Sequence, residues 1–276
     1  LLLILFGNVL GIGSYEILRF APDARSLALN NSSSAHDSYI LRNNPASLSI
    51  NNKKMIYSYF SIPANISCVQ IQKSKKNGSG ILAGKALLAN YGTIIDNNKN
   101  DLINAYDALI EIGYKNELKN IISIGISGGY LISSISNYSS HLFFSKIGMR
   151  SRMMQKRMGI GISLENIGFV TSSYTDIDEP LPSIIRSSIY YKPIFLPIII
   201  NGDLLHEINL QTINYLIGIE FIASKKIICR FGFNSQRSNS LNDNFPSDFI
   251  TSISGGIGLI FNNNTVDIGF LNLGSA

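Results

Sequence analysis

The sequence has few charged residues and few of the residue types that build catalytic or metal centres. Only 15% of its 276 residues are charged, against about 25% in a typical soluble protein. Its two cysteines, Cys68 and Cys229, stand singly in apolar stretches, with no Cys-x-x-Cys pair and no histidine at ligand spacing. We therefore expect no metal site, and the spacing leaves open whether the two cysteines form a disulfide.

Long apolar runs and clustered basic residues are also missing. The sequence contains no run of about 18 apolar residues, so no segment is long enough for a transmembrane helix. The net charge of +5 comes from scattered lysines and arginines rather than from a basic helix or stripe. We therefore expect no nucleic-acid partner.

The paired glycines in MGIGISLENIG, residues 158–168, do not make a nucleotide site. The dinucleotide fingerprint requires glycine where Leu164 stands. Instead, Met158, Ile160 and Ile162 alternate with small or polar residues, which is the period of a β-strand. We expect no cofactor here, and we interpret the stretch as a strand whose glycines let another part of the chain approach closely.

Beyond residue 52 the sequence divides into about thirteen alternating segments of about nine to twelve residues, separated by Asn, Ser, Gly, Lys or Pro clusters. In the clearest, AYDALIEIGYK at 105–115, apolar residues alternate with a face that carries Asp107 and Glu111. The segments begin near Lys54, Ile66, Ile81, Ala105, Asn120, His141, Met158, Ser183, Pro197, Ile213, Lys226, Asp248 and Thr265. This spacing predicts an all-β protein of consecutive strands.

Two all-β architectures fit this pattern, a soluble sandwich and a transmembrane β-barrel. The length of the segments and the tyrosines and phenylalanines near their ends favour antiparallel strands that cross a bilayer. In a barrel, Asp107, Glu111, Glu165 and Glu220 would face the lumen, because they lie opposite the apolar residues of their strands. We expect lumenal ion pairs that tie the wall to an inner segment, with a ligand-binding group of charges as the alternative.

The N-terminal part divides into two regions before the barrel, which we expect at 53–276. Residues 1–14, LLLILFGNVLGIGS, fit the apolar core and small-residue end of a truncated signal peptide, with a buried first strand as the alternative. Residues 15–52 are rich in Ser, Asn and Ala and lack sustained alternation. We expect this region to form a plug or hatch of short helices and turns inside or against the barrel.

Within this region, LRFAPDARSLALN and the later NNPASLS resemble the start of the PorV/PorQ family of outer-membrane barrels, which is related in fold to the fatty-acid transporter FadL. Further points of similarity follow in order along the chain. They include an Asn-x-Gly turn, a Leu-Pro-x-x-x-Arg strand start and three charged strand positions. The residues that carry the resemblance are Arg25, Asn44, Pro45, Asn166, Gly168, Leu181, Pro182, Arg186, Asp203, Glu220 and Arg230.

The resemblance implies a FadL-like barrel of about fourteen strands in the bacterial outer membrane, although the stretch 134–155 looks abbreviated for that fold. The stretch YTDIDEPLP of this sequence resembles the PorQ branch of the family more than the PorV branch. The implied function is non-enzymatic: a component of a type IX-like secretion system that helps to attach secreted cargo at the cell surface. The implied partners are other secretion-system or surface-attachment subunits and outer-membrane lipid or lipopolysaccharide.

The alternative function is a FadL-like conduit for hydrophobic small molecules. A conduit needs an apolar pocket or a lateral opening near the plug, whereas an anchor can be filled solid. The inner-face residues read as mostly small and polar, which favours the anchor. Catalysis is not expected, because His141 and Ser145, four positions apart on one strand, would lie about 13 Å from each other.

Overall fold

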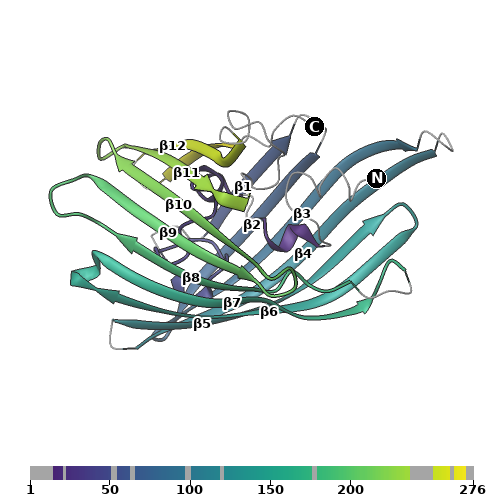
Figure 1. The fold of residues 1–276 in the computed structure, drawn as a ribbon, viewed down its shortest axis with the longest axis horizontal. Helices are drawn as coiled ribbons and strands as arrows, with labels where there is room; N and C mark the ends of the chain where they lie inside the picture. The colour runs from purple at the N-terminus through teal and green to yellow at the C-terminus, as the bar shows by residue number, and fades with distance from the viewer. Residues whose placement is uncertain are drawn as a thin grey trace.

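The structure is a computed structural model that describes residues 15–20, 23–50, 55–62, 66–96, 101–118, 121–175, 179–236, 251–261 and 264–271. The predicted signal peptide, residues 1–14, lies outside the described residues. Thirteen strands form one antiparallel sheet in which every strand pairs with its neighbours in sequence. The sheet curls around the N-terminal segment, drawn in purple in Figure 1.

Each of the thirteen predicted segments overlaps one strand of the described residues. The resemblance implies about fourteen strands for the whole barrel. Several strands are longer than expected: β4 has 18 residues. β6 has 16, so the stretch predicted to be abbreviated is a full strand. The strands are β1 Met55–Ile62, β2 Ile66–Asn77, β3 Gly80–Asp96, β4 Asp101–Leu118, β5 Ile122–Ile135, β6 Tyr138–Met153, β7 Met158–Ser172, β8 Ile184–Tyr191, β9 Ile198–Glu207, β10 Thr212–Ile222, β11 Ile227–Asn234, β12 Ile253–Phe261 and β13 Asn264–Leu271.

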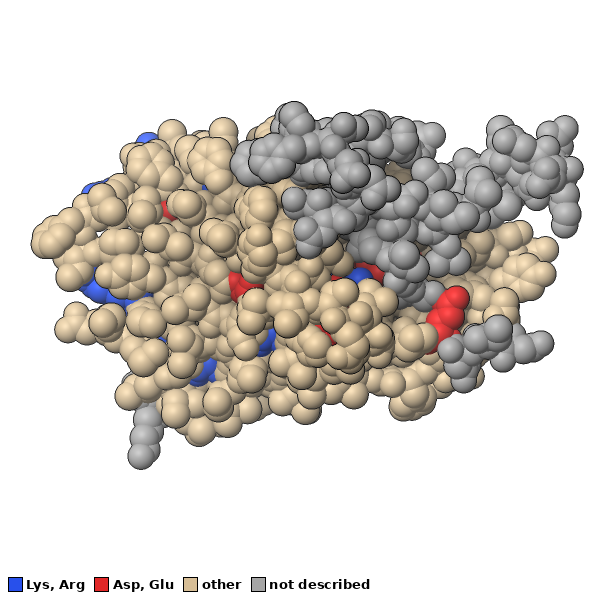
Figure 2. Space-filling view, in the orientation of Figure 1, with Lys and Arg blue, Asp and Glu red and all other residues tan. Residues whose placement is uncertain are grey.

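The side chains of the sheet follow the pattern of a barrel in lipid rather than that of a soluble sandwich. Along β8, Arg186, Ser188 and Tyr190 are buried, while Ile185 and Ile189 on the opposite face are exposed. The outer surface is correspondingly poor in charge over most of the face shown in Figure 2. Polar residues therefore face inward and apolar residues face outward, which is the arrangement of a transmembrane barrel.

Four short helices lie wholly within the described residues. They are η1 Glu16–Leu18, α2 Ala24–Ala28, η2 Pro45–Ser47 and, in the turn between β6 and β7, η3 Met154–Lys156. Asp23 caps α2 by accepting a hydrogen bond from the backbone N–H of Ser26. Among the described residues, every helix is far too short to cross a bilayer. Cys68 and Cys229 are both free thiols.

The predicted Asn-x-Gly turn at Asn166 and Gly168 is wrong, because both residues lie inside β7. Asn166 has a left-handed backbone, with φ of 58°, which asparagine tolerates better than most residues. The pairing of β6 with β7 shifts register between Ser145 and Ile147. The pattern therefore marks a β-bulge, and pairing of β7 with β8 stops just before it, at Glu165 and Ile184.

The two ends of the sheet differ in their connections. One end carries the turns β2–β3, β4–β5, β6–β7, β8–β9, β10–β11 and β12–β13, and we call it the short-turn end. The other end carries the two longest connections, from Ser172 to Ile184 and from Asn234 to Ile253. We call it the long-loop end.

Candidate functional site: the lumen and its plug

Residues 15–20 and 23–48, which we call the plug, touch both margins of the sheet. Near one margin, the Leu41 N–H donates to Gln72 Oε1 on β2 at 2.6 Å. Near the other, the backbone of Ala24 lies so close to Gly269 on β13 that a β-carbon there would overlap it. The sheet therefore wraps around the plug, and the plug fills much of the lumen.

Glycines on the inner face make room for the plug. The turn that Asn44 and Pro45 form lies against Gly125 of β5 and Gly148 of β6, where a β-carbon would overlap plug atoms. Asn44 Oδ1 caps η2 by accepting from the Ala46 N–H at 2.9 Å. Its Nδ2 donates to the carbonyl oxygens of Met149 and Ile162 on the wall, at 3.3 and 3.4 Å. Asn44 thus closes its own turn and fastens that turn to β6 and β7.

An ion-pair network joins the plug to β10 and β11. Arg25 donates from Nη2 to Glu220 Oε1 at 2.7 Å and from Nε to Oε2 at 3.1 Å. Arg230 donates to the same carboxylate at 3.0 Å and to Asp267 of β13 at 2.7 Å. Three residues from the sequence resemblance, Arg25, Glu220 and Arg230, therefore meet in one buried group.

His36 lies beside this network as a neutral ring. Its Nδ1 lies 2.6 Å from Arg25 Nη2 and must accept, because a guanidinium can only donate. Burial, and then the positive charge of Arg25, lower the pKa of His36 to about 3. Although Nδ1 is also 3.6 Å from Glu220 Oε1, the two do not form an ion pair, because the ring is uncharged near neutral pH.

A second network gathers Arg186 and Asp203, again residues from the sequence resemblance. Arg186 donates to Glu165 of β7 at 2.7 and 3.2 Å and to Asp203 of β9 at 3.2 Å. The backbone N–H of Ser34 in the plug donates to Asp203 at 3.3 Å. This arginine links three neighbouring strands, and Asp203 extends the link to the plug.

A third network lies on β3, β4 and β6. The Nζ atoms of Lys85 and Lys146 lie 2.5 and 3.3 Å from the carboxylate of Glu111. Lys85 also donates to the plug carbonyl of Leu41 at 3.1 Å. The charged residues predicted to face the lumen thus do so. Glu220 forms an ion pair with Arg25 of the plug, whereas Glu111 and Glu165 pair with residues of neighbouring strands. Asp107 accepts hydrogen bonds from Tyr91 and Ser133.

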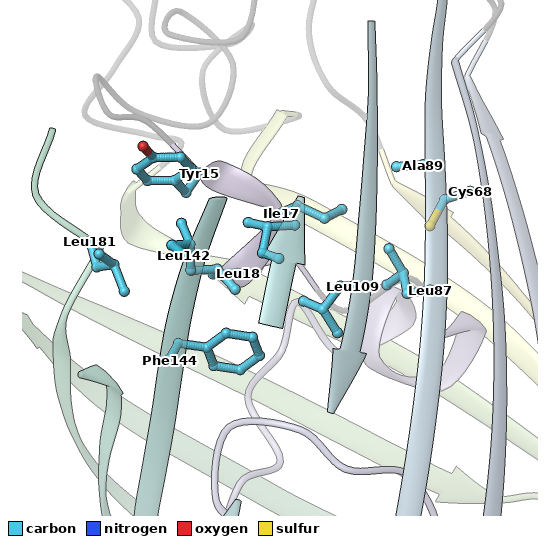
Figure 3. Packing of buried hydrophobic residues seen from close by; sticks show 11 residues of the cluster. Tyr15, Ile17, Leu18, Cys68, Leu87, Ala89, Leu109, Leu142, Phe144 and Leu181 are labelled. Atoms are coloured by element: carbon cyan, nitrogen blue, oxygen red, sulfur yellow. The ribbon is translucent and has the colours of Figure 1, made fainter. Parts of the chain in front are cut away.

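Between these charges and the long-loop end, the inner face becomes apolar. Wall residues, most of them on β2 to β6, pack there around Tyr15, Ile17 and Leu18 of the plug (Figure 3). Phe20 packs against the same group. We call this group the apolar chamber; its wall residues are Cys68, Leu87, Ala89, Leu109, Leu131, Leu142, Phe144 and Leu181. The prediction of a mostly small and polar inner face is therefore wrong for this part of the lumen.

A signal for the chamber was present in the sequence. Leu109 stands between Asp107 and Glu111 on the inward parity of β4, and Leu142 and Phe144 share the parity of Lys146 on β6. Several neighbouring strands thus carry large apolar residues at inward positions of the same half. Large apolar residues that interrupt the polar inner face in the same half of several neighbouring strands indicate an apolar compartment in the lumen.

An open pocket of about 410 Å³ adjoins the chamber where β7 and β8 separate. Its lining combines apolar with polar residues: Gly168, Phe169, Val170, Pro180 and Leu181, together with Glu179, Ser183 and Asn209. Leu181 is also a chamber residue, and Val170 packs against the chamber. One side of these two residues therefore faces the chamber and the other faces the pocket.

Asn166 joins the chamber's plug residues to this break in the wall. Its Nδ2 donates to the Pro182 carbonyl at 3.0 Å and to the Leu18 carbonyl at 3.5 Å. Ser183 Oγ donates to the Asn166 carbonyl at 3.0 Å. The bulge in β7 thus contacts both the plug and the residues that lead into β8.

His141 and Ser145, the pair considered for catalysis, have separate partners. His141 Nδ1 is 2.8 Å from the Tyr130 hydroxyl, whereas Ser145 Oγ donates to the Ile167 carbonyl at 2.9 Å.

Comparisons with known proteins identify the fold. No protein-family model and no curated protein matches the chain. Among solved structures, the Ralstonia pickettii toluene transporter TbuX is similar over 90% of this chain and 92% of its own, at 11% identity and a TM-score of 0.56. A mutant of the monoaromatic hydrocarbon channel TodX is similar over 90% and 92%, at 10% identity and a TM-score of 0.59. The chain thus has the all-β, antiparallel fold of these two solved structures.

Proposed function

We propose that this protein is a non-enzymatic outer-membrane conduit for hydrophobic small molecules. The observation that carries the proposal is that the apolar chamber and the open pocket in the wall are separated only by side chains such as Leu181 and Val170, which contact both. A concave site with apolar side chains and a few polar groups favours small, largely apolar ligands. The alternative function from the sequence is therefore preferred over surface attachment.

The plug residues in the chamber occupy the space that a hydrocarbon would need. Ile17, Leu18 and Phe20 line a remaining cavity of only about 20 Å³, which is room for one water molecule. A ligand must therefore displace these side chains, exchanging one set of apolar contacts for another. This exchange costs little free energy, because the chamber stays filled with apolar groups.

The route out of the chamber leads sideways. Toward the short-turn end, the lumen is crossed by the plug and by the ion networks of Glu111, Arg186 and Glu220, where an apolar molecule would separate buried charges from their partners. At the pocket, by contrast, Phe169 is exposed on the outer face. A hydrophobic molecule that passes Leu181 and Val170 would enter the lipid beside Phe169.

The similar structures support this proposal through their ligands. TbuX is described as a toluene transporter and TodX as a monoaromatic hydrocarbon channel. A monoaromatic hydrocarbon is thus the natural first probe. A role in a type IX-like system, with secretion or surface-attachment subunits as partners, rests only on the sequence resemblance to PorV and PorQ.

Uptake of labelled toluene by cells that carry the protein in their outer membrane tests the proposal. Val170→Trp should fill the passage between chamber and pocket and reduce uptake. Ile160→Trp, on the outer face of the same strand and outside the pocket lining, should leave uptake unchanged. Uptake equal to that of cells without the protein would overturn the conduit. Co-purification of secretion-system subunits, together with absent uptake, would instead support the attachment role.

A further inference from the structure

A charged cluster at the short-turn end is larger than the plug requires. Arg150 of β6 donates to Asp37 Oδ1 of the plug at 2.6 Å, and Arg152 Nη1 lies 4.0 Å from the same oxygen. Arg152 also pairs with Glu117 of β4, whose other oxygen is 3.5 Å from Lys115 Nζ. Three cations therefore share two carboxylates, and one positive charge is left without a counter-charge inside the cluster.

The cluster also holds hydrogen-bond donors that are not used. The Arg150 side chain is fully buried, and within the described part of the chain its Nε and Nη2 have no hydrogen-bond partner. The same holds for Arg152 Nε and for the hydroxyl of Ser123, which stands opposite Arg150 on β5. Buried donors are costly when they lack acceptors. A single acceptor with several oxygens would satisfy these unused donors, which lie on the neighbouring strands β5 and β6.

The cluster is open to the short-turn end through its carboxylates. The side chain of Asp37 is 38% exposed and that of Glu117 is 24% exposed, whereas the three cations are buried. Asp37 is a carboxylate supplied by the plug, and it engages one nitrogen of Arg150. Its negative charge therefore competes with an incoming anion for the positive charge of Arg150.

We propose that Lys115, Ser123, Arg150 and Arg152 form a binding site for a small oxyanion of the phosphate class, and that Asp37 of the plug competes for it. A phosphate group offers three or four oxygens and pairs with a guanidinium through two of them. A carboxylate offers only two oxygens and leaves part of the site unfilled. Bound phosphate takes Arg150 from Asp37 and so loosens the short-turn end of the plug. This site is separate from the apolar chamber and does not depend on hydrocarbon transport.

Calorimetric titration of inorganic phosphate into the full-length protein, in a nonionic detergent without phosphate, tests the proposal. Wild type should bind saturably. Arg150→Gln should weaken binding at least about tenfold, because it removes a charge-assisted bond. Asp37→Asn should strengthen binding, since the competing charge is removed while the shape is kept. Lys226→Gln, in the exposed β10–β11 turn, is the matched control and should bind as wild type does.

Two further measurements guard the result. Arg150→Lys keeps the charge but loses the bidentate contact, so it should bind phosphate more weakly than wild type does. This variant provides the test if Arg150→Gln does not fold. Electrophoretic mobility before and after boiling reports whether each variant is folded. A short-chain phosphatidic acid that binds more tightly than inorganic phosphate assigns the site to a lipid headgroup, and equal or weaker binding assigns it to the free anion. The proposal is overturned if wild type shows no saturable binding, if acetate binds as well as phosphate, or if Asp37→Asn does not tighten binding.

Discussion

Arg25 of the plug and Glu220 of β10, 195 residues apart in the sequence, form a buried ion pair with two hydrogen bonds, of 2.7 and 3.1 Å. Glu220 also accepts from Arg230 at 3.0 Å. One carboxylate thus balances an arginine of the plug and an arginine of the wall. The position of the plug is fixed by this shared charge as well as by apolar packing.

Removal of that charge should release the plug. We expect Glu220→Gln to lower the free energy of unfolding by about 3 to 5 kcal/mol, because two buried guanidinium groups lose their partner. Urea unfolding in detergent measures the loss, and limited proteolysis should show new cuts within residues 15–48. Asp267→Asn is the control: its side chain is 28% exposed, so a change of about 1 kcal/mol or less is expected. An equal loss in both variants would show that Glu220 has no special role in holding the plug.

Gly148 should not tolerate a methyl group, because a β-carbon there overlaps Asn44 Oδ1. We expect Gly148→Ala to cost about 1 to 3 kcal/mol through overpacking and to shift the Asn44 turn away from β6. Gly84→Ala provides a matched control in β3, where nothing lies within 4 Å of the added carbon. The unfolding midpoints of the two variants give the comparison. If Gly84→Ala is as destabilised as Gly148→Ala, the plug does not set the requirement for glycine.

The two roles of Asn166 can be separated by two substitutions. Asn166→Gly keeps the left-handed backbone but loses the hydrogen bonds to Leu18 and Pro182, for an expected loss of about 1 kcal/mol. Asn166→Ala loses the same bonds and adds backbone strain of about 1 to 2 kcal/mol. Alanine should therefore be the more destabilising in urea unfolding. Equal losses would argue against a strained bulge at this position.

The neutral state of His36 predicts a pH dependence of stability. Its pKa falls from 6.5 to about 3 on folding, through burial and then Arg25. The unfolded chain therefore binds more protons between these values, so the contribution of His36 is complete above pH 6.5 and is lost as the pH falls toward 3. Lys192 opposes protonation, whereas Glu220 and Asp37 favour it. Melting temperatures of wild type and His36→Asn should converge as the pH is lowered from 7 to 4; a constant difference would contradict the prediction.

The course of the strands was predictable from the sequence because it depends on local alternation. Asp107 and Glu111 lie inward, as their parity in β4 indicates. The bulge at Asn166 was not predictable in the same way. An Asn-x-Gly pattern at the end of an alternating segment predicts a turn, and only the pairing with β6 and the contacts to Leu18 and Pro182 make it part of a strand.

The partners of the charged residues could not be predicted either. Parity places Glu165, Arg186 and Glu220 on the inner face, but it does not say that Glu220 pairs with Arg25 rather than with a neighbouring strand alone. That choice depends on how the plug folds inside the sheet. The apolar chamber is hard to predict for a different reason: Leu109 and Phe144 lie on different strands, and the alternation within one strand does not show that they meet.

Crystals soaked with bromobenzene offer the most direct measurement of the central claim, that the apolar chamber accepts hydrophobic small molecules in place of plug side chains. Anomalous scattering from bromine locates the ligand even where its electron density has no distinctive shape. We expect a peak among Leu109, Leu142 and Phe144, with Ile17 and Leu18 displaced from their positions in the chamber. Bromine peaks confined to the lipid-facing outer surface, with the plug unmoved, would contradict the conduit.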